Sequence, residues 1–195
     1  MSSQDVAISA AKLIHASYMD WKFNRLYKKA FEHGLSVEEL SNSDERFSLF
    51  MRAGRAFEVC SHKDAIDFIA DAMIGGIKKG DADKQPDMVH MAVGSLTGVT
   101  NTELNILVLM QKHNLYFNEY GTAISGDVKK DYEIDACKSL GIDAFKLGTL
   151  ANGLMRTGLV TPPAMNYGSY SQNTNALTPL AKDLFDYVYY IRRPQ

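Results

Sequence analysis

Apolar side chains recur at intervals of three and four over the first thirty residues, which is the spacing of an amphipathic helix. A first stripe is formed by Val6, Ala10, Leu13, Ile14, Tyr18 and Trp21. Past Asp20 the phase changes, and a second stripe is formed by Phe23, Leu26, Tyr27, Ala30 and Phe31. The pattern predicts one long helix or two joined helices over residues 4–33, with a kink or a change of packing partner near Asp20.

Three more segments up to residue 96 combine a helix start signal with apolar positions. Ser36 and Glu39 have the spacing of a capping box, in which each side chain bonds the backbone N–H of the other residue. Ser43 is suited to the N-cap of the next helix. The expected inward face of that helix is Phe47, Phe50, Met51, Gly54 and Phe57. After Ser61 a further stripe is formed by Ala65, Phe68, Ile69, Ala72, Met73 and Ile77. Residues 80–86 predict a polar loop, which is the candidate domain boundary. Residues 87–96 predict a further helix that connects the N-terminal bundle to the second half of the chain.

The second half of the chain predicts three helices, a hairpin and a terminal helix. Thr100 and Glu103 form a second capping box, and residues 115–130 predict a loop with a short strand at 115–117. A second helix is expected over 132–140, and a third one after Asp143 with the inward face Leu147, Leu150, Ala151 and Leu154. Thr178 and Pro179 are suited to the N-cap and first turn of the last helix.

This order of elements is typical of a winged helix-turn-helix. We therefore predict a mainly α protein, with an N-terminal helical bundle over 1–96 and a winged helix-turn-helix with a small β-hairpin over 97–195. The 195 residues, 46% of them hydrophobic, suffice for one compact unit or two small ones.

Charge does not favour nucleic acid or anionic lipid as a partner, because the net charge is only −2. Residues 1–96 hold 12 basic and 14 acidic side chains, and residues 97–195 hold 9 of each. Cys60 and Cys137 are far apart in sequence and are expected to be reduced thiols. With no signal peptide and no membrane-length apolar run in the sequence, we expect a cytoplasmic protein.

Catalytic and metal-binding patterns find little support in the sequence. The five histidines lack the spacing of metal ligands, and the two cysteines cannot form a Cys-x-x-Cys pair. Gly75 and Gly80 have the glycine spacing of a phosphate-binding loop, but Asp81 stands where that motif requires lysine. We expect no enzymatic activity, no metal and no cofactor.

Four segments together resemble uncharacterised bacterial helical proteins of the abortive-infection alpha type, which end in a winged-helix-like region. These segments are Ala65–Phe68, Leu104–Leu107, Leu154–Val160 and Leu177–Ala181. The resemblance covers roughly residues 45–190 and implies a bacterial or phage origin with a link to phage defence. The shared motifs are structural, so the resemblance implies no catalytic residues.

The third helix of a winged helix-turn-helix is the element that enters the DNA major groove. Opposite its apolar stripe, or beside it, lie the candidate contact residues Lys146, Thr149, Asn152 and Arg156. In a DNA-binding protein, Arg156 or Asn152 would contact base edges, while Lys146 and Thr149 would bind phosphates. Two cations are few for that purpose, because affinity for duplex DNA comes mostly from neutralised phosphates.

The expected wing carries no Lys or Arg between Arg156 and Lys182. Its candidate contact residues are Tyr167, Tyr170, Gln172 and Asn173. Uncharged tyrosine and amide side chains are typical of surfaces that bind proteins. We therefore favour a non-enzymatic regulatory protein that acts through protein–protein contacts. The alternative, a dimeric winged-helix transcriptional regulator that binds DNA, stays open.

Two further surfaces have a functional and a structural interpretation. The only basic cluster, on the first helix, consists of Lys22, Arg25, Lys28 and Lys29. It could contact phosphate or an acidic partner, but such a run is more often the solvated face of a helix. The terminal helix carries a dense aromatic set, Phe185, Tyr187, Tyr189 and Tyr190. This set could form a homodimer interface or pack on the N-terminal bundle of the same chain.

Overall fold

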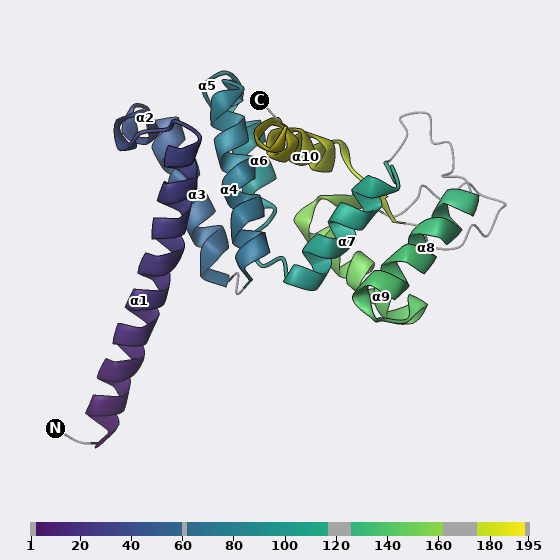
Figure 1. Cartoon of the computed structure of the whole chain (residues 1–195), viewed down its shortest axis with the longest axis horizontal. Helices are drawn as coiled ribbons and strands as arrows, with labels where there is room; N and C mark the ends of the chain where they lie inside the picture. The colour runs from purple at the N-terminus through teal and green to yellow at the C-terminus, as the bar shows by residue number, and fades with distance from the viewer. Residues whose placement is uncertain (1–2, 60–61, 117–125, 162–174, 194–195) are drawn as a thin grey trace.

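The computed structural model describes residues 3–59, 62–116, 126–161 and 175–193 and shows a mainly helical chain with one small sheet (Figure 1). The helices are α1 (Ser3–Glu32), α2 (Val37–Ser41), α3 (Asp44–Val59), α4 (Lys63–Lys78), α5 (Asp81–Lys84), α6 (Pro86–Gly94), α7 (Asn101–Lys112), α8 (Gly126–Leu140), α9 (Ala144–Gly153), the 3-10 turn η1 (Leu154–Thr157) and α10 (Pro179–Arg192). The strands are β1 (Val160–Thr161) and β2 (Ala176–Leu177). No helix in the described part of the chain is long and apolar enough to cross a bilayer.

The capping residues were predicted correctly wherever the structure describes them. Both capping boxes form, at the starts of α2 and α7. Ser43 accepts a hydrogen bond from the backbone N–H of Arg46, and Thr178 accepts one from Ala181. These signals succeed because each cap is a local contact between residues three apart, which depends little on the rest of the fold.

Helix α1 is a single helix from Ser3 to Glu32, and its packing on the bundle involves its C-terminal half. Leu26 and Ala30, from the second stripe, are fully buried where α1 packs on α3 and α4. Trp21, from the first stripe, is 45% exposed. In Figure 1 the N-terminal part of α1 extends past the ends of α3 and α4. The bundle therefore buries Leu26 and Ala30 of the second stripe and leaves Phe31, at 75%, exposed.

Three local expectations are wrong. Residues 81–84 form helix α5, whose Ala82 is buried, instead of part of a polar loop. Helix α8 begins at Gly126, six residues before the expected start, because this polar segment lacks a strong start signal. Phe47 and Met51 are 53% and 43% exposed, although both were expected to face inward. The helix α3 packs through its other apolar side chains, Leu49, Phe50, Ala53 and Phe57.

Helix α4 lies at the centre of the bundle and is buried along most of its length. A side chain at Gly75 would overlap the backbone carbonyl of Tyr187 in α10, and one at Gly76 would overlap Val89 in α6. Two adjacent glycines thus let α10 and α6 approach the α4 backbone closely. The terminal helix therefore packs on residues from the N-terminal half of the chain. The division at residue 96 stays a prediction.

The small sheet joins segments from three parts of the second half. β1 and β2 pair antiparallel, with Val160 opposite Leu177 and Thr161 opposite Ala176. Tyr116 forms an isolated parallel bridge with Leu177, at the position of the expected short strand. Leu147, Ala151 and Leu154 are buried as predicted, so α9 packs its apolar stripe on the core.

Lys22 is fully buried at the end of α3. Its ammonium donates hydrogen bonds to the carbonyls of Phe57 and Glu58, the second at 3.2 Å, and lies 4.2 Å from the ring centre of Tyr18. Carbonyls in the last turn of a helix have no partner within the helix and carry partial negative charge. Lys22 therefore serves as a C-terminal cap for α3 supplied by α1.

Replacing Lys22 by methionine should lower the free energy of unfolding by about 1–3 kcal/mol, because it leaves buried carbonyls without a donor. Urea unfolding of Lys22→Met measures this loss. The matched control is Lys28→Met in the same helix, where the side chain is 79% exposed. The control should change stability by less than about 0.5 kcal/mol. Equal stability of the two variants would contradict the capping role.

Gly75→Ala should destabilise the protein by about 1–3 kcal/mol or more, because the added methyl group collides with α10 backbone. The matched control is Gly148→Ala in α9, where a side chain would meet no neighbouring atom within 4 Å. That change should stabilise by about 0.5–1 kcal/mol through helix propensity. Thermal unfolding distinguishes the expected loss of stability in Gly75→Ala from the expected gain in Gly148→Ala. Unchanged stability of Gly75→Ala would show that α10 does not pack this closely on α4.

Candidate functional site

The outward face of α9 is the candidate contact surface. Asp143 caps the helix by accepting a hydrogen bond from the backbone N–H of Lys146 at 2.8 Å. Because Leu147 and Ala151 face the core, Lys146 and Thr149 are left on the exposed side. Phe145 lies next to Lys146 and is 85% exposed, the largest exposed fraction among the described large hydrophobic side chains. The surface is thus centred on an aromatic ring beside one cation.

The polar candidates of this face make hydrogen bonds within the protein. The hydroxyl of Thr149 donates to the carbonyl of Phe145 at 3.0 Å. The amide oxygen of Asn152 accepts a hydrogen bond from the amide nitrogen of Asn175 at 3.0 Å. Asn175 immediately precedes β2, so this bond ties the end of α9 to the sheet. Thr149 and Asn152 remain exposed on the surface.

Arg156 lies beyond the end of α9, in the turn η1, and pairs with Glu103 of α7. Its two terminal nitrogens donate to the two carboxylate oxygens of Glu103 at 2.6 and 2.9 Å. The same nitrogens donate to the carbonyls of Gly153 and Gly98 at 2.6 and 2.8 Å. With its donors occupied in this way, Arg156 stabilises the junction of α7 and η1.

The charge of Glu103 is maintained by these contacts although the residue is buried. Burial raises the pKa of Glu103, but the hydrogen bonds from Arg156 and Thr100 and the charge of Arg156 outweigh that effect and lower the pKa overall. The same pair raises the pKa of Arg156, chiefly through the hydrogen bond to Glu103. Sequence reasoning recognised Glu103 as a capping residue, but it had no signal for the pairing across 53 positions.

The four wing residues Tyr167, Tyr170, Gln172 and Asn173 lie outside the described residues. On the terminal helix, Phe185 and Tyr187 are buried on the bundle of the same chain, whereas Tyr189 and Tyr190 are 37% and 45% exposed. The homodimer expected through this helix stays a prediction.

The basic cluster of α1 is directed largely into the bundle. Lys22 caps α3, and Arg25 forms two hydrogen bonds with Asp67 of α4 at 2.7 and 2.6 Å. Lys29 pairs with Asp71 of α4 at 2.6 Å. Lys28 is the exposed member, 3.9 Å from Glu32. Three of these cations therefore hold α1 against its neighbours.

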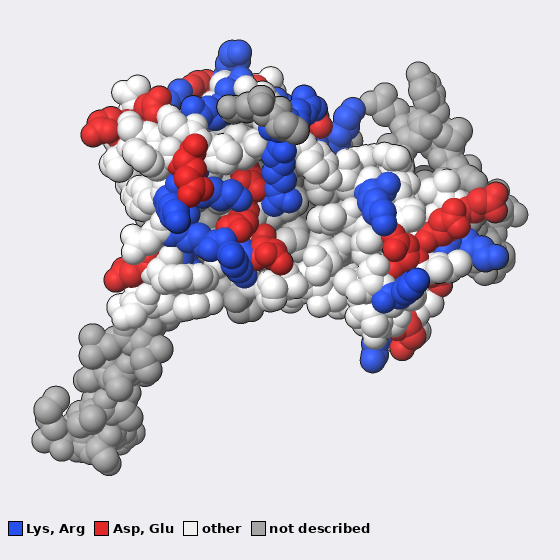
Figure 2. Space-filling model, viewed as in Figure 1, with Lys and Arg blue, Asp and Glu red and all other residues white. Residues whose placement is uncertain are grey.

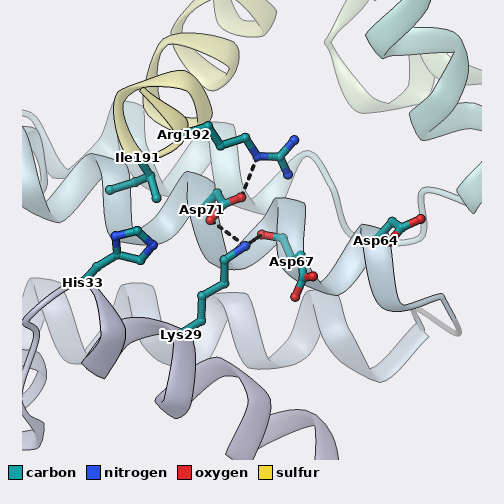
Figure 3. Close-up of a pocket in the computed structure, with 7 residues that line it drawn as sticks. All are labelled: Lys29, His33, Asp64, Asp67, Asp71, Ile191 and Arg192. Carbon is teal, nitrogen blue, oxygen red and sulfur yellow. Dashed lines mark hydrogen bonds and ion pairs between the residues drawn. The ribbon is translucent and has the colours of Figure 1, made fainter. Parts of the chain in front are cut away.

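A pocket of about 500 Å³ opens where α1, α4 and α10 meet (Figure 3). Its lining residues are Lys29, His33, Asp64, Asp67, Asp71, Ile191 and Arg192. The carboxylate of Asp71 is almost fully buried and binds both Lys29 and Arg192, the latter at 2.8 Å. Figure 3 shows Asp64 apart from this charged group. The pocket is thus crossed by ion pairs that join three helices.

The two buried or part-buried carboxylates of this pocket, Asp67 and Asp71, are paired with cations. Burial raises the pKa of Asp67, but the hydrogen bonds from Arg25 and the charges of Lys29 and Arg25 lower it overall. Within the described ranges, no three His, Cys, Asp or Glu side chains gather as a metal-binding group. The arrangement can hold the helices together, and it presents no buried unpaired carboxylate for acid–base chemistry.

Acidic and basic side chains are intermixed on the face shown in Figure 2, both over the bundle and over the α7–α9 part. The view shows no continuous cationic strip, which long contacts with phosphates require. In comparisons with known proteins, no family model, curated protein or solved structure matches this chain.

The contribution of Glu103 to stability should depend on pH in a defined direction. Its folded-state pKa is below the ordinary value of 4.5, so the contribution is complete above pH 4.5 and is lost as the pH falls through the folded-state pKa. At neutral pH, Glu103→Gln should cost about 1–3 kcal/mol, because Arg156 loses its charged acceptor.

Urea unfolding at a series of pH values from neutral to acidic tests this dependence. The stability difference between the wild type and Glu103→Gln should stay constant in the neutral range and shrink below about pH 4.5. Glu133→Gln, at an exposed position of α8, is the control and should differ little from the wild type throughout. If the stability difference between the wild type and Glu103→Gln grew in acid, the pKa of Glu103 would be raised in the folded state and not lowered.

Proposed function

We propose that this chain is a non-enzymatic regulatory protein that binds another protein through the outward face of α9. The observation that carries the proposal is the exposed ring of Phe145 on the same helix as the buried Leu147 and Ala151. Aromatic anchors with a polar surround are typical of protein-binding surfaces. Lys146, Thr149 and Asn152 supply that surround.

The winged-helix architecture that we propose for residues 97–195 is supported by the order of the elements. Helices α7, α8 and α9 precede an antiparallel strand pair, and α10 follows it. The bridge from Tyr116 to Leu177 brings the α7–α8 connection to the same sheet. In this arrangement α9 is the third helix, which is the contact element of such folds.

DNA binding through the same helix has weaker support. The sequence of α9 contains one cation, Lys146, and Arg156 donates to Glu103 and to two carbonyls. Moving Arg156 to a phosphate would leave the buried carboxylate of Glu103 without its partner, which is costly. The phage-defence role that the resemblance implies stays a prediction, and it is compatible with protein binding.

The first experiment separates protein binding from DNA binding. We expect no saturable binding of fluorescent mixed-sequence duplex DNA at low salt, measured by anisotropy, because few phosphates would be neutralised. Tight binding that weakens steeply with added salt, and that is lost in Lys146→Ala, would overturn the proposal in favour of the DNA-binding regulator.

The second experiment tests the α9 face directly. A photo-crosslinking amino acid at position 145, expressed in the native host, should give discrete protein adducts. The matched control is position 134 in α8, where Ile134 is also an exposed apolar residue, at 57%. Adducts at 145 that disappear with Thr149→Arg, and that are absent at 134, support the proposal. Equal labelling at both positions would contradict it.

A further inference from the structure

We infer that the pocket between α1, α4 and α10 binds a small phosphate monoester, with the phosphate group held by Arg192, Lys29 and His33 (Figure 3). This pocket belongs to the bundle, whereas α9 lies in the other part of the molecule (Figure 1). The inference therefore adds a ligand site to the proposed function and does not depend on it.

The pocket holds one positive charge more than its buried carboxylates neutralise. Asp67 is paired with Arg25, which donates to both of its carboxylate oxygens. Asp71, whose side chain is only 2% exposed, is shared by two cations, Lys29 at 2.6 Å and Arg192 at 2.8 Å. Because a carboxylate carries one negative charge, two cations on Asp71 leave one charge in excess. An anion bound beside them supplies the missing negative charge.

Asp64 is the remaining carboxylate of the pocket lining, and it lies away from this excess charge. Its side chain is 78% exposed, and Figure 3 shows it apart from the charged group around Asp71. The charge of an exposed group is screened by water and salt over roughly 10 Å. A ligand therefore meets positive charge at the Asp71 end of the pocket, and Asp64 marks the end that an anionic group avoids.

The unused hydrogen-bonding groups around Asp71 are donors. The Nε of Arg192 donates to Asp71, while its two terminal nitrogens, which Figure 3 shows on the side away from Asp71, donate to none of the described residues. The ammonium of Lys29 has three N–H groups and binds Asp71 and the carbonyl of Asp67, the latter at 3.0 Å. His33 adds a ring N–H, because either form of imidazole carries at least one. The pocket thus presents donors, which an anion accepts.

Arg192 is held in position for this role. Its Nε is anchored to the buried carboxylate of Asp71, and its guanidinium carbon lies 5.6 Å from the ring centre of Phe68, which is buried. Its two terminal nitrogens form one edge of a rigid, planar group, and such an edge binds two oxygens of a phosphate at once. A cation that is already fixed in place loses little conformational freedom when the ligand binds.

The donors and the size of the pocket favour a phosphate monoester over a simple carboxylate. A phosphate monoester has three terminal oxygens, so two can accept from Arg192 and the third from Lys29 or His33. Its charge near pH 7 is about −1.5 to −2, which is larger than that of a carboxylate. The cavity of about 500 Å³ is within the range of small-molecule sites, about 300–1,000 Å³. It therefore has room for an organic group beside the phosphate, with Ile191 as an apolar contact.

Isothermal titration calorimetry with glycerol phosphate, at an ionic strength kept constant with sodium chloride, tests the site. The wild type should bind this probe saturably, with a dissociation constant below about 1 mM. Arg192→Lys keeps a cation beside Asp71 but removes the two-nitrogen edge, so it should raise the dissociation constant at least about tenfold. The matched control is Arg46→Lys, because Arg46 also pairs with a carboxylate, Asp83, but does not line the pocket. The control should bind like the wild type.

Proton NMR of the wild type tests the location of the ligand without any substitution that affects folding. The ring protons of His33 should shift as glycerol phosphate is added and should give the same dissociation constant, because the ring lines the pocket. The ring protons of His90 should not shift, because His90 contacts the carbonyl of Glu45 elsewhere in the bundle. The spectrum of His33→Gln identifies the His33 signal, and circular dichroism identifies any variant that fails to fold.

Four results would overturn the inference. The first is the absence of both saturable heat and a His33 shift at concentrations well above the expected dissociation constant. The second is an equal loss of affinity in Arg192→Lys and Arg46→Lys, which would indicate a general charge effect. The third is tighter binding of glycerate, which would assign the site to carboxylates. The fourth is cosedimentation with phosphatidic acid vesicles without binding of glycerol phosphate, which would assign it to a lipid surface.

The two proposals fail separately. Equal photo-crosslinking at positions 145 and 134, together with intact glycerol phosphate binding, would contradict the proposed function alone.

Discussion

The close approach of α10 to α4 at Gly75 is the contact on which the rest of the structure depends. It brings a helix from the end of the chain against the centre of the N-terminal bundle, where α4 is buried. A buried carboxylate, Asp71, lies at the same junction and binds Lys29 of α1 and Arg192 of α10. An unpaired charge at this depth would be strongly unfavourable, so the three helices favour one arrangement.

The same principle explains why three of the candidate ligand-binding cations are not free on the surface. Lys22 caps α3, Arg25 binds Asp67, and Arg156 binds Glu103. Each of these cations satisfies a carboxylate or carbonyl that packing would otherwise leave poorly solvated. Phe145 on α9 and Trp21 and Phe31 on α1 are among the apolar side chains that packing leaves exposed. These two apolar surfaces lie on separate parts of the molecule, as Figure 1 shows for α1 and α9.

The sequence by itself determined where four of the helices begin, because Ser36, Thr100, Asp143 and Thr178 act through hydrogen bonds to residues three positions away. It also determined the buried stripes of α4 and α9, since helical periodicity assigns a stripe to one face of its own helix. Only the tertiary structure decided which neighbour covers each stripe. Helical periodicity predicted that Phe47 faces inward, but Phe47 is exposed because α1 covers only part of α3. The sequence suggested Arg156 as a ligand contact, but its guanidinium binds Glu103, 53 positions away. A local sequence pattern contains no information on contacts at that separation.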